Sequence, residues 1–144
     1  MIERSDEALG VAKRFITALA QRDGEALCSV LHEDVTVENP FPMVEGENRP
    51  GSRRCRGASV HAHMKNMPHV LGSLRFENVI WRTTSDGLAM FEADGDATLP
   101  NGRPYRNHYL MLFEVALRKI VHWQEYYSPV IAARANGMPL DLLP

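Results

Sequence analysis

The sequence predicts a single α+β domain in which helices come first and a run of long antiparallel strands follows. Apolar residues recur at helical spacing in the N-terminal third, and apolar and polar residues alternate through the C-terminal half. Turn-forming residues separate the alternating segments. A chain of 144 residues fits one domain, spanning residues 1–144. A curved sheet with helices on one face encloses a cavity, the usual place for a small-molecule site.

Three helices are predicted. Ser5, followed by two acidic residues, is typical of a helix start, and the first helix should end near Asp23-Gly24. Its apolar stripe consists of Ala8, Val11, Ala12, Phe15, Ile16 and Leu19. A shorter helix should carry Ala26 to Leu31, and a third should run from Ala58 to about Met67 and end at Pro68.

The remaining elements are predicted as strands and loops. A short β-branched strand, Val35–Asn39, ends at Pro40, and residues 40–52 form a loop rich in proline and glycine. Later strands are expected at residues 74–81, 88–99, 105–115 and 120–127, followed by a short tail from Pro129. Asn101-Gly102 is a strong hairpin signal because both residue types tolerate positive φ.

Charge and composition exclude several classes of partner. The net charge is −2, which argues against nucleic acid or an anionic membrane surface. Four arginines cluster near the third helix, and they form either a solvated loop or an entrance that attracts a carboxylate: Arg49, Arg53, Arg54 and Arg56. Because the first residues contain no apolar run typical of a signal peptide, we expect a cytoplasmic protein.

No metal and no organic cofactor are expected. Cys28 and Cys55 form no CxxC motif and should both be unpaired. His61 and His63 are two residues apart on a predicted helix, so their side chains diverge and do not suit one metal ion. The sequence has no glycine-rich phosphate loop.

Glu125 is the main candidate for chemistry. On its predicted strand it shares a face with Val121, Trp123 and Tyr127, which are all largely apolar. Such surroundings raise the pKa of a carboxyl group, as a general acid or base near neutral pH requires. The alternative is a structural glutamate bound to the backbone or to an arginine.

His63 is the second candidate. At helical spacing its neighbours are Val60, Met64 and Met67, so it should point with them toward the sheet, whereas His61 should be solvated. A histidine on an apolar face is either a satisfied core residue or a proton-transfer partner for Glu125. His122 is out of phase with Glu125 and should lie on the opposite face.

Residues 31–40, LHEDVTVENP, resemble the opening of ketosteroid isomerases. The spacing between Phe15 and Asn39 is similar to theirs between the oxyanion-hole tyrosine and the catalytic aspartate, and Asn107-His108-Tyr109 stands where they carry Asp-His-Phe. The resemblance implies their cone-shaped fold, the nuclear transport factor 2-like or cystatin-like α+β barrel. It excludes their mechanism, because asparagine accepts no proton from carbon and phenylalanine donates no hydrogen bond.

Residues 55–139 resemble SnoaL-like proteins of the phenazine-biosynthesis A/B type. The matching motifs are Asn107–Leu110, Gln124–Pro129 and Gly137–Pro139. In that family a helix histidine and a strand-end glutamate act as acid and base on a small carboxylated ring precursor. The resemblance assigns these roles to Glu125, without a gap, and to His63, with one residue deleted in the helix.

Two functions follow as hypotheses. The first is a cofactor-free isomerase, cyclase or dehydratase, similar to polyketide cyclases, that acts on a small cyclic or carbonyl-bearing metabolite, for example one of secondary metabolism. The second is a non-catalytic module of the same fold that binds a small molecule or serves for dimerisation. In both cases we expect a homodimer through the outer sheet face. The residues expected around the ligand are Phe15, Asn39, Met64, Met67, Asn107, Tyr109, Met111, Trp123 and Tyr127.

Overall fold

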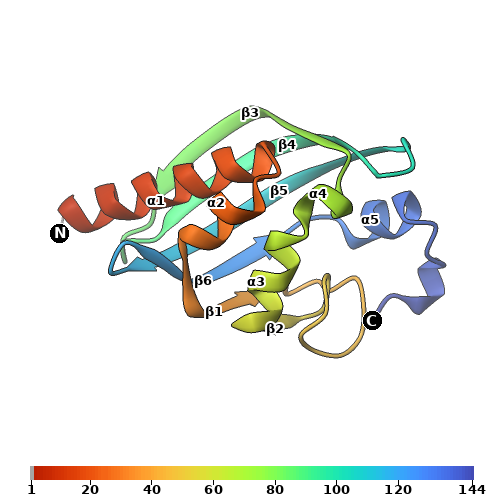
Figure 1. Cartoon of the computed structure of the whole chain (residues 1–144), viewed down its shortest axis with the longest axis horizontal. Helices are drawn as coiled ribbons and strands as arrows, with labels where there is room; N and C mark the ends of the chain where they lie inside the picture. The colour runs from red at the N-terminus through yellow and green to blue at the C-terminus, as the bar shows by residue number, and fades with distance from the viewer. Residues whose placement is uncertain (1) are drawn as a thin grey trace.

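The structure is a computed structural model that describes residues 2–144, with side chains described from Ser5 onward. Five helices, six strands and a short 3-10 turn follow one another along this part of the chain (Figure 1). The order is α1 (Ile2–Ala20), α2 (Gly24–Ser29), β1 (Leu31–Glu38), β2 (Arg54–Arg56), α3 (Ala58–Lys65), α4 (Met67–Val70), β3 (Ser73–Thr83), β4 (Ala89–Thr98), β5 (Pro104–Ala116), β6 (Lys119–Tyr126), α5 (Pro129–Ala135) and η1 (Leu140–Leu142).

The six strands form one curved sheet in the order β2-β1-β6-β5-β4-β3. The long strands β3 to β6 pair antiparallel with their neighbours in sequence, as predicted. The sequence did not predict how the first strand pairs, and in the structure β1 pairs with β6 in parallel. This pairing brings Val37 beside Trp123, so the end of β1 lies next to the strand that carries Glu125.

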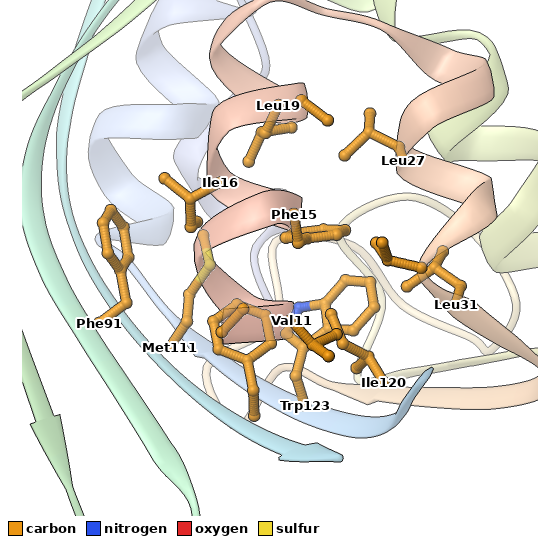
Figure 2. Close-up of a cluster of buried hydrophobic side chains, with 14 of the residues drawn as sticks. Val11, Phe15, Ile16, Leu19, Leu27, Leu31, Phe91, Met111, Ile120 and Trp123 are labelled. Carbon is orange, nitrogen blue, oxygen red and sulfur yellow. The ribbon is translucent and has the colours of Figure 1, made fainter. Parts of the chain in front are cut away.

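Helix α1 lies across the concave face of the sheet, and α2 and α3 continue the cover toward β1 (Figure 1). The predicted apolar stripe of α1 is buried throughout, with Ala12 at 0% and Phe15 at 1% exposure. Figure 2 shows Phe15 and Val11 of this helix pointing toward Trp123 of the sheet. Phe15 lies with its ring centroid 5.1 Å from that of Trp123. The apolar stripe therefore attaches the helix to the inner face of the sheet.

Several predicted boundaries were wrong. Ser5 lies inside α1, which starts at Ile2, so Ser5 is not its N-cap. Pro68 does not end a helix but opens α4, where its missing N–H is harmless. No strand was predicted at residues 54–56, where β2 forms after the predicted loop. The predicted tail contains α5, which Ser128 caps by accepting a hydrogen bond from the backbone N–H of Ile131 at 3.2 Å.

The outer face of the sheet carries the polar residues of the alternation. Asp94 and Asp96 lie on this face, because they share the strand phase of Met90 and Glu92. His108 bridges the carboxylates of Asp94 and Glu92, at 2.8 Å each, and these hydrogen bonds raise the pKa of its imidazole. Along the described residues, the structure has no helix long and apolar enough to cross a membrane.

Candidate functional site

The concave side of the sheet holds a cavity of about 280 Å³, lined mainly by apolar side chains. The loop between β1 and β2 closes part of it with Met43, Pro50 and Gly51; α5 contributes Ala132, and the residue after α5 is Asn136, which also lines the cavity. The residues predicted from the sequence that line this cavity are Phe15, His63, Met64, Met67, Tyr109, Met111, Trp123, Glu125 and Tyr127. Its size and apolar wall suit a small organic molecule.

Glu125 carries the only carboxyl group among the described residues that line the cavity. It lies on β6, where its backbone pairs with that of Met111. The side chain of Glu125 is half-buried and lines the cavity. Burial raises the pKa of this carboxyl group from 4.5 to about 7. The Trp123 indole partly opposes this rise, although its Nε1 forms no hydrogen bond within the described structure. Near neutral pH the carboxyl and carboxylate forms are therefore both populated.

No basic side chain contributes to this pKa shift. The alternative considered above, a structural glutamate paired with an arginine, would show the opposite shift, because a neighbouring cation stabilises the carboxylate. Glu125 is thus a buried acid without a counter-ion in the described part of the chain.

His63 lies on α3 and lines the same cavity as Glu125. Its position beside the buried residues Val60 and Met64 follows from helical spacing, as predicted. Burial lowers the pKa of its imidazole, and no carboxylate counteracts this effect. The imidazole is therefore neutral at neutral pH, so it can accept a proton or donate its single N–H.

Three tyrosines line the cavity close enough to Glu125 for its charge to affect them. Tyr109 donates a hydrogen bond to the Tyr105 oxygen at 3.2 Å, and Asn107 donates to the same oxygen at 3.0 Å. Burial raises the pKa of Tyr105, Tyr109 and Tyr127, and the negative charge of Glu125 adds to the rise. All three remain protonated near neutral pH and can donate hydrogen bonds.

A smaller annex of about 70 Å³ adjoins the cavity, and His63, Trp123 and Glu125 line both. Asn39 lines the annex, is 4% exposed, and donates a hydrogen bond from Nδ2 to the Tyr127 hydroxyl at 2.9 Å. Its Oδ1 and the Trp123 Nε1 are buried and have no hydrogen-bond partner in the part of the protein that the structure describes.

Comparison with known proteins decides the family. A sequence profile of the SnoaL-like domain matches residues 12–123, which is most of the chain. The chain belongs to the SnoaL-like domain family. The uncharacterized protein YesE of Bacillus subtilis strain 168 is 22% identical to this SnoaL-like chain over 141 residues, which cover 95% of the chain and 92% of YesE.

Solved structures share the fold of this SnoaL-like domain. A candidate isomerase from Bacillus subtilis superposes with a TM-score of 0.80 at 21% identity, covering 94% of this chain and 96% of its own. A phenazine biosynthesis-related protein from Pseudomonas aeruginosa superposes with a TM-score of 0.71 at 19% identity, covering 96% and 86%. The predicted nuclear transport factor 2-like fold and SnoaL-like membership are confirmed.

Asn107 does not line the cavity of this SnoaL-like domain, in contrast to the prediction that it contacts the ligand. Its Nδ2 donates to Tyr105 and to the Ser128 carbonyl oxygen, and its Oδ1 accepts from the backbone N–H groups of His108 and Ser128. Every hydrogen-bonding position of the amide is therefore used within the protein. Asn107 positions Tyr105 and the start of α5.

The other histidines lie away from the cavity. His122 faces outward, where its Nδ1 is 2.6 Å from the Thr36 hydroxyl, as its phase predicted. His61 is not simply solvated, because its Nε2 lies 3.0 Å from the carbonyl oxygen of His32. Among the described residues, no group of three or more histidine, cysteine or acidic side chains is arranged to hold a metal ion.

The arginine cluster lies outside the cavity wall. Arg54 approaches the carboxylates of Glu38 and Glu47, at 3.9 Å each, while Arg53 and Arg56 are exposed. Both cysteines are free thiols. The Sγ of Cys28 is 3.4 Å from the carbonyl oxygen of His61, and that of Cys55 is 3.1 Å from the carbonyl oxygen of Arg49.

Sequence reasoning missed Tyr105 and the loop residues Met43, Pro50 and Gly51. Tyr105 could have been found, because it shares the strand phase of Tyr109 and Met111. The loop residues carried no such signal, since neither helical nor strand periodicity applies to an irregular segment.

Proposed function

We propose that this SnoaL-like protein is a cofactor-free acid/base enzyme of the isomerase, cyclase or dehydratase type. Its substrate would be a small cyclic or carbonyl-bearing metabolite bound in the apolar cavity, and the sequence favours a cytoplasmic site of action. One observation carries the proposal: the buried carboxyl group of Glu125 has a pKa of about 7, has no counter-ion, and faces the cavity. A general acid or base is most effective when its pKa lies near the working pH.

The surrounding groups fit a proton transfer next to a carbonyl. The carboxylate form of Glu125 removes a proton from the carbon beside the carbonyl group, and the electron pair of that C–H bond moves toward the carbonyl oxygen. The Tyr105 hydroxyl accepts two hydrogen bonds, so its own hydrogen is available to the developing oxyanion. Neutral His63, which lines the same cavity from α3, supplies a second position where a proton can be taken or returned.

Similar folds support this reaction type without specifying it. The structurally similar proteins include a candidate isomerase and a phenazine biosynthesis-related protein. At these identities the likeness concerns the fold, and one fold carries many chemistries.

Deuterium exchange tests the proposal without knowledge of the natural substrate. A panel of cyclic ketones, including 2-tetralone, is incubated with the protein in deuterated buffer, and NMR follows loss of the hydrogens beside the carbonyl. We expect wild-type protein to accelerate exchange of at least one ketone, and Glu125→Gln to slow that exchange by about 100-fold. Glu114→Gln is the matched control, because Glu114 is an exposed residue of the neighbouring strand.

The mainly apolar wall of the cavity also fits a non-catalytic module that binds a small molecule. The two functions differ at Glu125. If no ketone exchanges faster with wild-type protein than with Glu125→Gln, while a ketone still binds to both with similar affinity, the binding module is correct and the enzyme proposal is wrong.

We further propose that two copies associate through the outer sheet face. Apolar side chains sit side by side there: Met90 pairs with Leu112, and Leu110 pairs with Tyr126. Phe41, which is 61% exposed, extends this patch with its ring centroid 6.2 Å from that of Tyr126. Light scattering should give a dimer for wild-type protein and a monomer for Leu110→Asp; a wild-type monomer contradicts this arrangement.

A further inference from the structure

The annex beside Glu125 combines a small volume with two unsatisfied polar atoms. Asn39 Oδ1 is a hydrogen-bond acceptor and Trp123 Nε1 is a donor, and neither has a partner among the described residues. Asn39 is 4% exposed and Trp123 is 1% exposed, so bulk water does not serve either group. Buried polar groups are nearly always paired, and each exception needs an explanation.

Two other polar side chains of the annex are already used. The Ser52 hydroxyl donates to the carbonyl oxygen of Arg49 at 2.7 Å, and the Cys55 thiol lies 3.1 Å from that same oxygen. Asn39 Nδ2 donates to the Tyr127 hydroxyl. The polar groups left for an occupant are therefore the acceptor Asn39 Oδ1, the donor Trp123 Nε1, the imidazole of His63 and the carboxyl group of Glu125.

We infer that the annex is a subsite for a neutral O–H group, bound between Asn39 Oδ1 and Trp123 Nε1. A hydroxyl group donates to the amide oxygen and accepts from the indole N–H at the same time. A ketone oxygen satisfies only the indole, and a carboxylate would face the amide oxygen and Glu125 without a compensating cation. The volume of about 70 Å³ accommodates a hydroxyl group or a few water molecules, but not a ring.

The O–H group has two possible sources, a hydroxyl substituent of the ligand or a bound water molecule. In both cases the O–H group lies beside Glu125. The inference therefore rests on the proposed function and adds detail to it: the substrate either carries a hydroxyl group next to its apolar body or reacts beside a bound water molecule. The apolar body then occupies the main cavity, whose wall includes Phe15, Met64 and Met111.

Matched probes test the annex by binding alone. Tetralin, 2-tetralol, 2-tetralone and tetralin-2-carboxylate share one apolar body and differ in the polar group. Affinities are measured by calorimetry, and crystal structures of the tetralin and 2-tetralol complexes show what occupies the annex. The variants are Asn39→Leu, which removes the amide, and Trp123→Phe, which removes the indole N–H. Asn136→Leu is the control, because Asn136 lines the main cavity but not the annex.

If the hydroxyl comes from the ligand, 2-tetralol binds about ten-fold more tightly than tetralin, and its oxygen lies in the annex. Asn39→Leu and Trp123→Phe each remove most of that difference, and the control does not. If the source is water, tetralin and 2-tetralol bind equally, an ordered water occupies the annex in both complexes, and either variant removes it. Trp123→Phe keeps the inference testable if Asn39→Leu does not fold.

Two results would overturn the inference: an annex without water or hydroxyl in both complexes, or tighter binding of the ketone or the carboxylate with its oxygen in the annex. Because no turnover is measured, this outcome is separate from that of the proposed function. Deuterium exchange that depends on Glu125 would support the proposed function even if the annex were empty. Hydroxyl binding in the annex would support this inference even if no ketone exchanged its hydrogens.

Discussion

Replacing Glu125 by glutamine should change the stability of the protein in a pH-dependent way. The pKa of Glu125 is about 7 in the folded protein, against 4.5 for an ordinary glutamate. A difference of about 2.5 pKa units corresponds to about 3 kcal/mol, since each unit is about 1.4 kcal/mol. This is the free energy that folding loses when the carboxyl group must be charged in its buried position.

The sign follows from proton binding. Between pH 4.5 and about 7 the folded protein holds a proton on Glu125 that the unfolded chain has released. Stability therefore falls as the pH rises through this window, and the full loss is present above the folded pKa. Glutamine has no charge at any pH and avoids the loss.

Urea unfolding of wild-type protein and Glu125→Gln at about pH 4 and about pH 8.5 measures this difference. We expect nearly equal stability at the lower pH and a gain of up to about 3 kcal/mol for Glu125→Gln at the higher pH. Glu114→Gln, on the exposed side of β5, should show no such trend. A difference that does not change with pH, or a loss of about 3–5 kcal/mol on replacement, would show a structural glutamate and refute the reasoning.

Four other substitutions test the cavity and the packing around it. His63→Gln should slow ketone exchange by about 100-fold. Burial lowers the pKa of His63, so protonation of this histidine opposes folding, and the stability of the variant should fall less than that of wild-type protein as the pH drops below 6.5. Equal dependence of stability on pH in the two proteins would contradict this reasoning. Gly95→Ala should destabilise the protein by about 1–3 kcal/mol, since the new Cβ would lie 2.5 Å from Tyr109 Cε2. Gly10→Ala in α1 should stabilise it by about 0.5–1 kcal/mol, because the new Cβ would meet Arg14 Nη1 at an ordinary contact distance of 3.9 Å. Equal shifts in melting temperature would refute the steric argument. Tyr105→Phe should cost about 1–3 kcal/mol because two buried donors lose their acceptor, and an unchanged unfolding midpoint would show that this network contributes little.

Sequence periodicity was sufficient for the long helix, the long strands and the direction of most of their side chains. The stripe of α1, the inward face of β6 and the outward position of Asp94 all follow from local geometry, which repeats every 3.6 residues in a helix and every two in a strand. Glu125 was found in this way, because its neighbours in phase, Trp123 and Tyr127, are apolar.

Sequence periodicity could not predict hydrogen bonds between residues that are far apart in the chain. Asn107 has the strand phase of the cavity residues, yet Ser128 and Tyr105 occupy its amide and withdraw it from the ligand. Asn39 shows the reverse case: its Nδ2 is paired with Tyr127, but its Oδ1 has no partner in the described structure. The sequence alone does not show whether a polar side chain finds a hydrogen-bond partner in the folded protein.

The sequence by itself determined the α+β class, the apolar face around Glu125 and the likeness to SnoaL-like proteins, because these depend on residues close together in the chain. Only the tertiary structure decided that β1 joins β6 in parallel, that the loop before β2 closes the cavity, and that no cation reaches Glu125 in the part of the chain described. The pKa of a buried acid depends on everything packed around it, and those neighbours come from segments that only folding brings together.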